Sequence, residues 1–191
     1  PAWLFSWAVA VVLFLSFMAL GVLWRRPTLA EERWRPLPGG IGRALGSRPL
    51  ELAAGATGVL LLGLVVWSGL GGKQDNPAAN FAPVFVYVAF WVGLVFASVL
   101  LGDLFHGFNP WRALGRSAGW LAGRVLGSRL PAPLRYPAGL GRWPAVAGLV
   151  AFGWLELVSA EGATPRTVAL AALAYTGVTL VAMALFGVET W

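Results

Sequence analysis

Five runs of apolar residues divide this sequence, and the segments between them hold nearly all of its charge. The runs cover residues 2–24, 52–71, 81–104, 143–159 and 165–187. A helix needs about 20 apolar residues to cross a bilayer, and these runs are of that order. The alternative, buried helices of a large soluble protein, would leave no polar face for water. The pattern therefore predicts an all-α, polytopic membrane protein, a single membrane domain with about five transmembrane helices.

Basic residues are concentrated in two of the connecting segments. Residues 25–50 contain six arginines and residues 105–142 another six, whereas the short segment 72–80 holds only Lys73. Short basic loops remain on the cytoplasmic side of a membrane. We therefore predict that both arginine-rich segments are cytoplasmic, with the N-terminus outside and the C-terminus inside. Because the sequence starts at Pro1 and stops as a helix finishes, we also expect a fragment of a longer chain.

The composition narrows the chemistry. The 191 residues are 58% hydrophobic and only 12% charged, with no cysteine and a single histidine, whereas soluble domains carry about 25% charged residues. These counts exclude disulfides, thiolate ligands and sites built from several histidines within this chain. No metal site is predicted, and the cofactor is left unassigned. The net charge of +6 comes from arginines placed between apolar runs, which favours anionic lipid headgroups over nucleic acid as partners.

Asp103 and His106 stand at the end of the third run, where a catalytic pair is one possibility. If the helix continues, residues three apart share a face, so the carboxylate would lie beside the imidazole. Such a pair fixes the tautomer of a general base. The competing interpretation is structural, because ionisable groups near a membrane interface reach water at low cost.

A surface helix is expected next, over residues 110–127. Asn109 is a good helix cap and Pro110 suits a first helical position. Asn109 is also a candidate ligand or ion contact. Apolar residues recur at helical spacing, and Arg112, Arg116 and Arg124 are available to lipid headgroups. This pattern predicts an amphipathic helix at the cytoplasmic interface. Glycines at every fourth position, 115, 119, 123 and 127, predict close packing against a neighbour, although a poorly helical loop is the alternative.

Glu156 interrupts the fourth run. A carboxylate in the bilayer centre costs about 2.5–3.5 kcal/mol on insertion scales, so we expect it to face other helices or a polar cavity. An ion or proton path, a ligand contact and an interhelical hydrogen bond are all open.

Part of the sequence is repeated. Residues 42–48 match residues 123–129 at six of seven positions, an offset of 81. The match suggests duplication of a two-helix unit, and chance in a low-complexity sequence is the alternative.

Three stretches, residues 1–7, 82–112 and 143–157, resemble multi-pass membrane proteins of high-GC bacteria that carry the name fenitrothion hydrolase. The resemblance implies a bacterial inner-membrane location and a longer full-length protein. It also implies hydrolysis of an organophosphate triester, and it assigns no catalytic residues.

Our leading interpretation is a subunit of a bacterial inner-membrane complex, which packs against other subunits or further copies of itself through glycine-rich faces. The first alternative is a membrane-bound hydrolase that uses Asp103 and His106 with residues of a partner. The second is a small-solute or ion permease that uses Glu156. Whether the chain is an enzyme at all is left open by the sequence.

Overall fold

The computed structural model describes residues 11–12, 14–19, 21–22, 47–101, 103–127 and 132–191, which fall into two compact units, Pro1–Ala44 and Leu45–Trp191. The described residues of the first unit are helical and belong to the first apolar run. Residues 42–46 of the repeated motif lie outside the described residues, so the duplication stays a prediction. Within the described ranges the protein is all-helical, without strands, as the sequence predicts.

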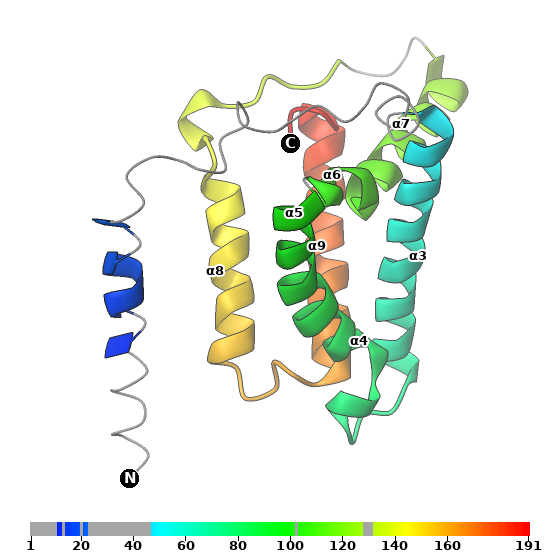
Figure 1. Cartoon of the computed structure of the whole chain (residues 1–191). Coiled ribbons are helices and arrows are strands. Elements are labelled where there is room, and N and C mark those ends of the chain that lie inside the picture. The colour runs from blue at the N-terminus through cyan, green and yellow to red at the C-terminus, as the bar shows by residue number, and fades with distance from the viewer. Residues whose placement is uncertain (1–10, 13, 20, 23–46, 102, 128–131) are drawn as a thin grey trace. The chain divides into compact units, whose positions relative to one another are not determined.

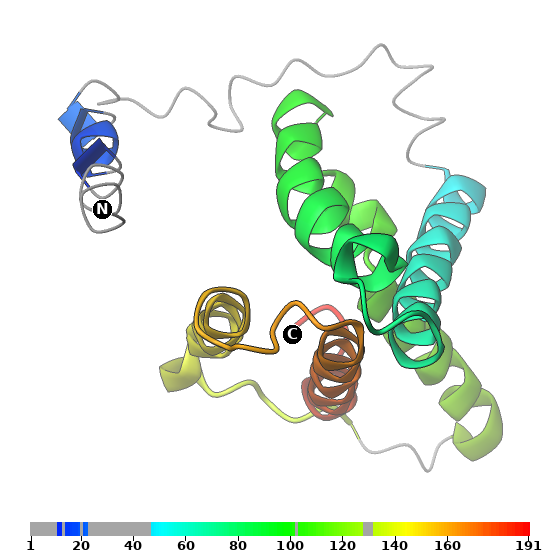
Figure 2. The ribbon, with the colours of Figure 1, turned by 90° about the horizontal axis from the view of Figure 1, so that it is seen from below.

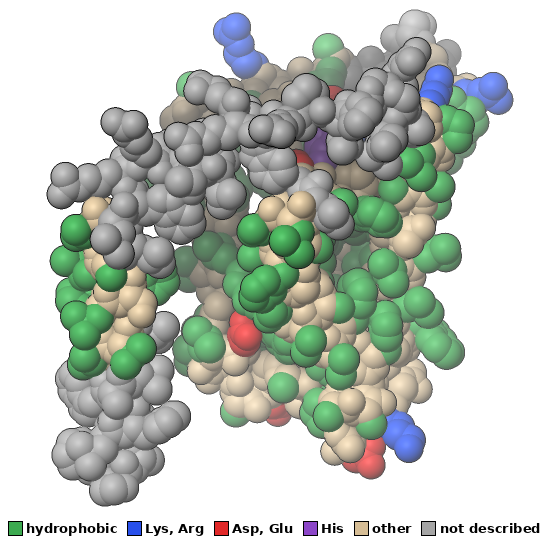
Figure 3. All heavy atoms as spheres, viewed as in Figure 1, with side chains coloured by type: hydrophobic (Ala, Val, Ile, Leu, Met, Phe, Trp, Pro, Cys, Tyr) green, Lys and Arg blue, Asp and Glu red, His purple; other side chains and the backbone are tan. Residues whose placement is uncertain are grey.

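Three helical segments of the second unit are long and apolar enough to cross a membrane (Figure 1). They are α3 (Arg48–Gly71), the composite helix Phe81–Leu100, and α9 (Pro165–Phe186). The fourth apolar run forms the shorter α8 (Trp143–Leu157). On the face shown in Figure 3, hydrophobic side chains occupy the middle of the visible helices, whereas Lys and Arg lie toward the upper and lower ends. This distribution matches the apolar band that a bilayer requires.

A stripe of small residues on α3 organises the second unit. The buried residues of α3 are Gly55, Gly58, Val65 and Gly69, and their spacing places them along one helix face. A Cβ added to Gly69 would lie 2.6 Å from both the Cβ of Ala169 and the carbonyl oxygen of Pro165. Because only glycine permits this approach, α3 and α9 meet backbone to backbone near one end.

Two side chains join the helices at that end. Asn80, which is buried, accepts a 2.9 Å hydrogen bond from the amide of Ala82 and donates to the carbonyls of Ser68 and Lys73. Gln74 donates to the carbonyl of Gly69 and accepts the amide of Arg166. These contacts fix the short connection that contains the 3-10 turn η2 (Pro77–Ala79).

The composite helix departs from a simple span. It consists of α4 (Phe81–Val84), the π-helix η3 (Phe85–Gly93) and α5 (Leu94–Leu101). The sequence predicts one helix to residue 104, but α5 ends at Leu101 and the short α6 (Leu104–Phe108) follows. Asp103 has a non-helical backbone, with ψ of 74°. The chain therefore turns before it reaches the expected end of the span.

After this turn the chain forms α7 (Pro110–Leu126), close to the predicted range. Gly127 then ends it with a φ of 53°, a value that favours glycine. Seen from below, α7 crosses α3, and α8 lies beyond α9 on the other side of the unit (Figure 2). The remaining 3-10 turn, η5 (Ala138–Leu140), precedes α8.

Candidate functional site

The candidate site is the elbow, residues 103–109, together with the first turns of α7. Asp103 caps α6 because its Oδ1 accepts a 3.1 Å hydrogen bond from the backbone amide of His106. The sequence suggests a carboxylate beside an imidazole. The structure instead pairs the carboxylate with the amide, because the helix breaks at Asp103 and no longer continues α5. The role of the two residues in catalysis stays a prediction.

The imidazole of His106 contacts Arg112 rather than Asp103. Its Nε2 meets Nη1 of Arg112, and because an arginine can only donate, Nε2 is the acceptor of this bond. The side chain of His106 is exposed, whereas that of Arg112 is only 17% exposed. The contact therefore links the elbow to a partly buried cation.

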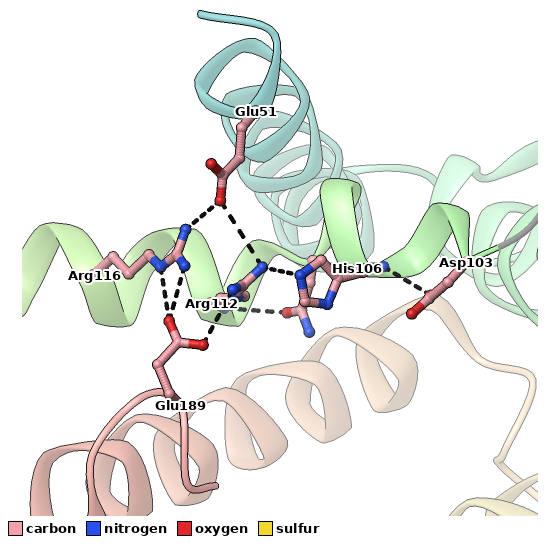
Figure 4. A network of polar contacts seen from close by, with 7 residues as sticks. Glu51, Asp103, His106, Arg112, Arg116 and Glu189 are labelled. Carbon is pink, nitrogen blue, oxygen red and sulfur yellow. Dashed lines mark hydrogen bonds and ion pairs between the residues drawn. The ribbon is translucent and has the colours of Figure 1, made fainter. Parts of the chain in front are cut away.

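Arg112 and Arg116 are held by two carboxylates from distant parts of the sequence (Figure 4). Glu189 bonds Nη2 of Arg112 at 3.1 Å and the guanidinium of Arg116 at 2.9 and 3.0 Å. Glu51 pairs with Arg116 and lies 3.9 Å from Arg112. The two arginines thus join the start of α3, α7 and the segment after α9.

The ion pairs shift the affinity of these groups for protons. The hydrogen bonds from Arg116 and then Arg112 lower the pKa of the Glu189 carboxyl. Hydrogen bonds to Glu189 and Glu51 raise the pKa of Arg116. Both shifts favour the charged forms. Because the side chain of Glu189 is 64% exposed, solvent screens much of the attraction.

Asn109 caps α7 as the sequence predicts. Its Oδ1 accepts hydrogen bonds from the amides of Trp111 and Arg112, at 3.0 and 3.1 Å, with Pro110 in the first turn. The side chain of Asn109 is therefore occupied by backbone amides. The cap fixes the direction in which α7 leaves the elbow.

A row of aromatic rings packs against the elbow and connects it to the composite helix and to α9. Phe105 lies with its ring centroid 5.6 Å from Phe90 and 6.3 Å from Trp111, which meets Tyr175 edge-on at 4.8 Å. Nε1 of Trp111 donates a 2.9 Å hydrogen bond to Oγ1 of Thr176. The elbow thus folds back against the composite helix and reaches the middle of α9.

The other residues that the sequence singles out on α7 differ in their surroundings. Arg124 lies over the ring of Trp120, 4.8 Å from its centroid, in a cation–π contact. The predicted close packing occurs at Gly115, where a Cβ would be 2.8 Å from Sδ of Met183. It does not occur at Gly119, which has no such neighbour within 4 Å. The glycines of α3 make more of the close approaches than this stripe does.

Glu156 is remote from the elbow and lies in the last turn of α8. Its side chain is exposed on this chain, and it interacts electrostatically with Tyr87. The hydroxyl of Tyr87 donates a 2.7 Å hydrogen bond to the carbonyl of Gly162. The structure therefore does not bring Glu156 together with Asp103 or His106.

The chemistry available at the elbow is that of hydrogen bonding and ion pairing. Among the described residues, no group of three His, Asp or Glu side chains could hold a metal ion. An apolar groove of about 660 Å³ between α3, α7 and α9 is lined by residues such as Val66, Leu114 and Leu173, without a charged side chain. Polar chemistry is therefore centred on the elbow and α7.

Sequence reasoning missed both carboxylates of the network as site residues. Neither Glu51 nor Glu189 belongs to a motif that the sequence pattern singles out. Their signal was weak because each is separated from the arginines by more than 60 positions. An excess of arginine on an otherwise apolar helix was the available clue that acidic partners lie elsewhere.

Searches against protein-family models, curated proteins and solved structures found no match to this chain.

Proposed function

We propose that the chain is an integral membrane subunit of a multi-subunit complex in a bacterial inner membrane. In this arrangement it crosses the bilayer five times, with the N-terminus outside and the C-terminus inside, and α7 reaches the cytoplasmic interface. The three candidate spans and the arginine-rich segments support the membrane location. The bacterial inner membrane rests on the sequence resemblance.

The observation that carries the proposal is the exposure of α8. This helix has no buried residue. It contacts the rest of the second unit through Phe152, whose ring lies 4.5 Å from Trp91 and 5.9 Å from Tyr87, and through Gly148, where a Cβ would lie 3.8 Å from the ring of Tyr175. Its other side exposes 58% of Trp154 and 81% of Leu157. A helix so loosely held gains stability by packing against another protein surface.

Glu156 strengthens this argument. It is exposed in the last turn of α8, one turn beyond Phe152, and ionisable groups in membrane helices almost always face protein or water rather than lipid. A donor from a second subunit would satisfy the carboxylate. The fifteen residues of α8 rise about 22 Å, which is short of the ~30 Å hydrocarbon core. Its polar end would then lie near the interface, where such a contact costs least.

Photo-crosslinking tests the proposal with two matched aromatic positions. A benzophenone amino acid replaces Trp154, which points outward, or Phe152, which points toward Tyr87. After irradiation of native membranes, we expect position 154 to give a discrete adduct with another membrane protein, which co-purifies in mild detergent at fixed stoichiometry. Position 152 should give adducts within the chain. A purified monomer that gives no adduct at position 154 contradicts the proposal. An adduct between two copies of this chain would show that the partner of α8 is a second copy of the chain and not a different subunit.

The hydrolase is the second candidate, and one observation favours it. The imidazole of His106 is exposed, so a substrate can reach it, and once Arg112 releases Nε2 the lone pair of this nitrogen is free to accept a proton as a general base does. Phosphotriester hydrolysis by the complex should then be lost in His106→Ala and kept in Ser117→Ala, a variant of an exposed α7 residue. Unchanged hydrolysis in His106→Ala removes this candidate.

A further inference from the structure

The elbow lies deep along the helices that support it. Phe108 and Pro110 pack on Gly58, where a Cβ would collide with the carbonyl of Phe108. Gly58 is ten residues beyond the first residue of α3, and Thr176, which bonds Trp111, is ten residues before the last residue of α9. At 1.5 Å per residue, both routes place the elbow about 15 Å from the ends of these helices.

From that depth α7 runs along α3 toward the first residue of α3. Pro110 lies beside Gly58, Ala113 lies 3.0 Å from a Cβ added to Gly55, and Arg116 pairs with Glu51 in the first turn of α3. As residue numbers rise along α7, the contacted residue numbers on α3 fall, so the two helices are antiparallel and α7 runs toward the first residue of α3. The composite helix begins at the other end of α3, where the Cβ of Ala82 lies 3.3 Å from a Cβ added to Gly69. The composite helix, α6 and α7 therefore run from one end of α3 to the other, and the elbow is a break within this crossing.

The elbow is also polar and exposed on this chain. Asp103 and Asn109 have non-helical backbones, and the side chains of Asp103 and His106 are exposed. Within a hydrocarbon core, irregular backbone and ionisable groups occur only where protein buries them or water reaches them. One continuous set of polar contacts connects the elbow to the helix ends, from His106 through Arg112 to Glu189.

The charged side chains in this set of contacts indicate which ions would be attracted to it from water. Asp103, Glu51 and Glu189 are acidic and Arg112 and Arg116 are basic, so the carboxylates of this set outnumber its arginines by one. These groups come from the elbow, α3, α7 and the segment after α9. A site of that charge attracts cations, including protons, rather than anions.

We propose that the elbow interrupts a membrane crossing and lines a water-filled vestibule, open at the end where Glu51 and Glu189 lie, which admits small hydrated cations to Asp103 and His106. The proposal does not depend on a partner subunit or on catalysis. Under the predicted topology the vestibule opens to the cytoplasm.

The chain contains no cysteine, so single cysteines report directly on access. Phe108→Cys places a thiol in the elbow at a side chain that is 42% exposed. Leu60→Cys and Val178→Cys place thiols at similar depth on α3 and α9, at side chains that are 68% and 64% exposed. Ser117→Cys on the exposed part of α7 is the surface reference. Each single-cysteine variant of the full chain is treated in native vesicles with two membrane-impermeant thiosulfonates, one cationic and one anionic, and the rate of labelling is measured.

We expect Cys at position 108 to react within about tenfold of the surface reference, because water carries the charged reagent to it. The thiols at positions 60 and 178 should react at least about 100-fold more slowly, because the reagent would have to enter hydrocarbon. Labelling should occur in vesicles of one orientation only. Rates at position 108 as slow as those at positions 60 and 178, or equal labelling from both sides, overturn the proposal.

The charge preference gives an independent readout. The ratio of cationic to anionic labelling at position 108 should exceed that at position 117. Asp103→Asn should reduce this ratio several-fold, because the amide keeps the α6 cap but removes the charge. A ratio that Asp103→Asn leaves unchanged contradicts a cation-selective vestibule. Because all thiol variants are compared in folded, membrane-inserted protein, a variant that does not insert is replaced by Gly107→Cys, where the added Cβ meets only Ala54 at 3.9 Å.

Discussion

Trp111 is tied to Thr176 by a 2.9 Å hydrogen bond, although the two residues are 65 positions apart. The same hydroxyl donates a 2.7 Å bond to the carbonyl of Ala172, one turn earlier in α9. The hydroxyl therefore accepts from the indole while its own proton stays within the helix. Because the ring of Trp111 also packs against Tyr175, one side chain couples the start of α7 to the centre of α9.

We predict that Trp111→Phe and Thr176→Val each lower the free energy of unfolding by about 0.5–1.5 kcal/mol, the net value of one hydrogen bond. The double variant should lose less than the sum, because both changes remove the same bond. Thermal unfolding of the full chain in detergent measures this. Strict additivity would mean that the bond contributes nothing.

Replacement by alanine should change the stability of the protein in opposite directions at two glycines of α3. Gly58→Ala should destabilise the protein by about 1–3 kcal/mol, because the new Cβ would collide with the backbone at Phe108. Gly63→Ala should be neutral or stabilise by up to about 1 kcal/mol, because no neighbouring atom lies within 4 Å and alanine favours helix. Equal effects of the two changes in the same melting assay would show that the elbow does not pack on α3.

The caps of α7 and α3 provide another matched pair. Asn109→Ala should cost about 1 kcal/mol, because two amides of α7 lose their acceptor. Ser47 occupies the corresponding position of α3 without a side-chain hydrogen bond, so Ser47→Ala should change little. Asn109→Asp should restore most of the stability. Limited proteolysis between α6 and α7, followed by mass spectrometry, would locate any loosening.

The pairing of Glu189 predicts a dependence on acid. Its pKa is lowered from an ordinary 4.5 mainly by Arg116, so the pair stabilises the folded state above pH 4.5 and this contribution disappears as the pH falls through the lowered pKa. Wild type should be more stable than Glu189→Gln at pH 7, by at most about 1 kcal/mol because the group is exposed.

In melting experiments from pH 7 to pH 3, the difference between wild type and Glu189→Gln should shrink below pH 4.5. Glu161→Gln changes an exposed carboxylate of the opposite loop and serves as the control. A wild-type advantage that grows as the pH falls would reverse the assigned sign.

Much of the helical layout follows from the sequence because it depends on local patterns. The apolar runs predict α3, α8 and α9 to within a few residues, and the dipeptide Asn109-Pro110 predicts both the start and the cap of α7. These features depend on neighbouring residues only, which is the information that periodicity and capping rules contain.

The turn of the chain at Asp103 and the network around Arg112 could not be predicted in this way. Residues 81–101 are apolar nearly throughout, and their sequence contains no mark of a π-helix or of an early end. The partners of Arg112 and Arg116 depend on how α3 and α9 cross, which is set by close contacts at glycines such as Gly69. A sequence pattern identifies small residues, but it does not say which of them meet another helix.

The glycine face of α3 also has a consequence for biosynthesis. Gly69 packs on Ala169, which is made 100 positions later. At translation rates of about 5–20 residues per second, α3 resides in the membrane for about 5–20 s before its main partner is available. During that interval Ala82 of the composite helix can already contact Gly69, but the part of this face that Ala169 covers in the folded protein has no partner from α9. Correct assembly of this protein therefore depends on keeping other helices off the Gly69 face of α3 until α9 has been synthesised.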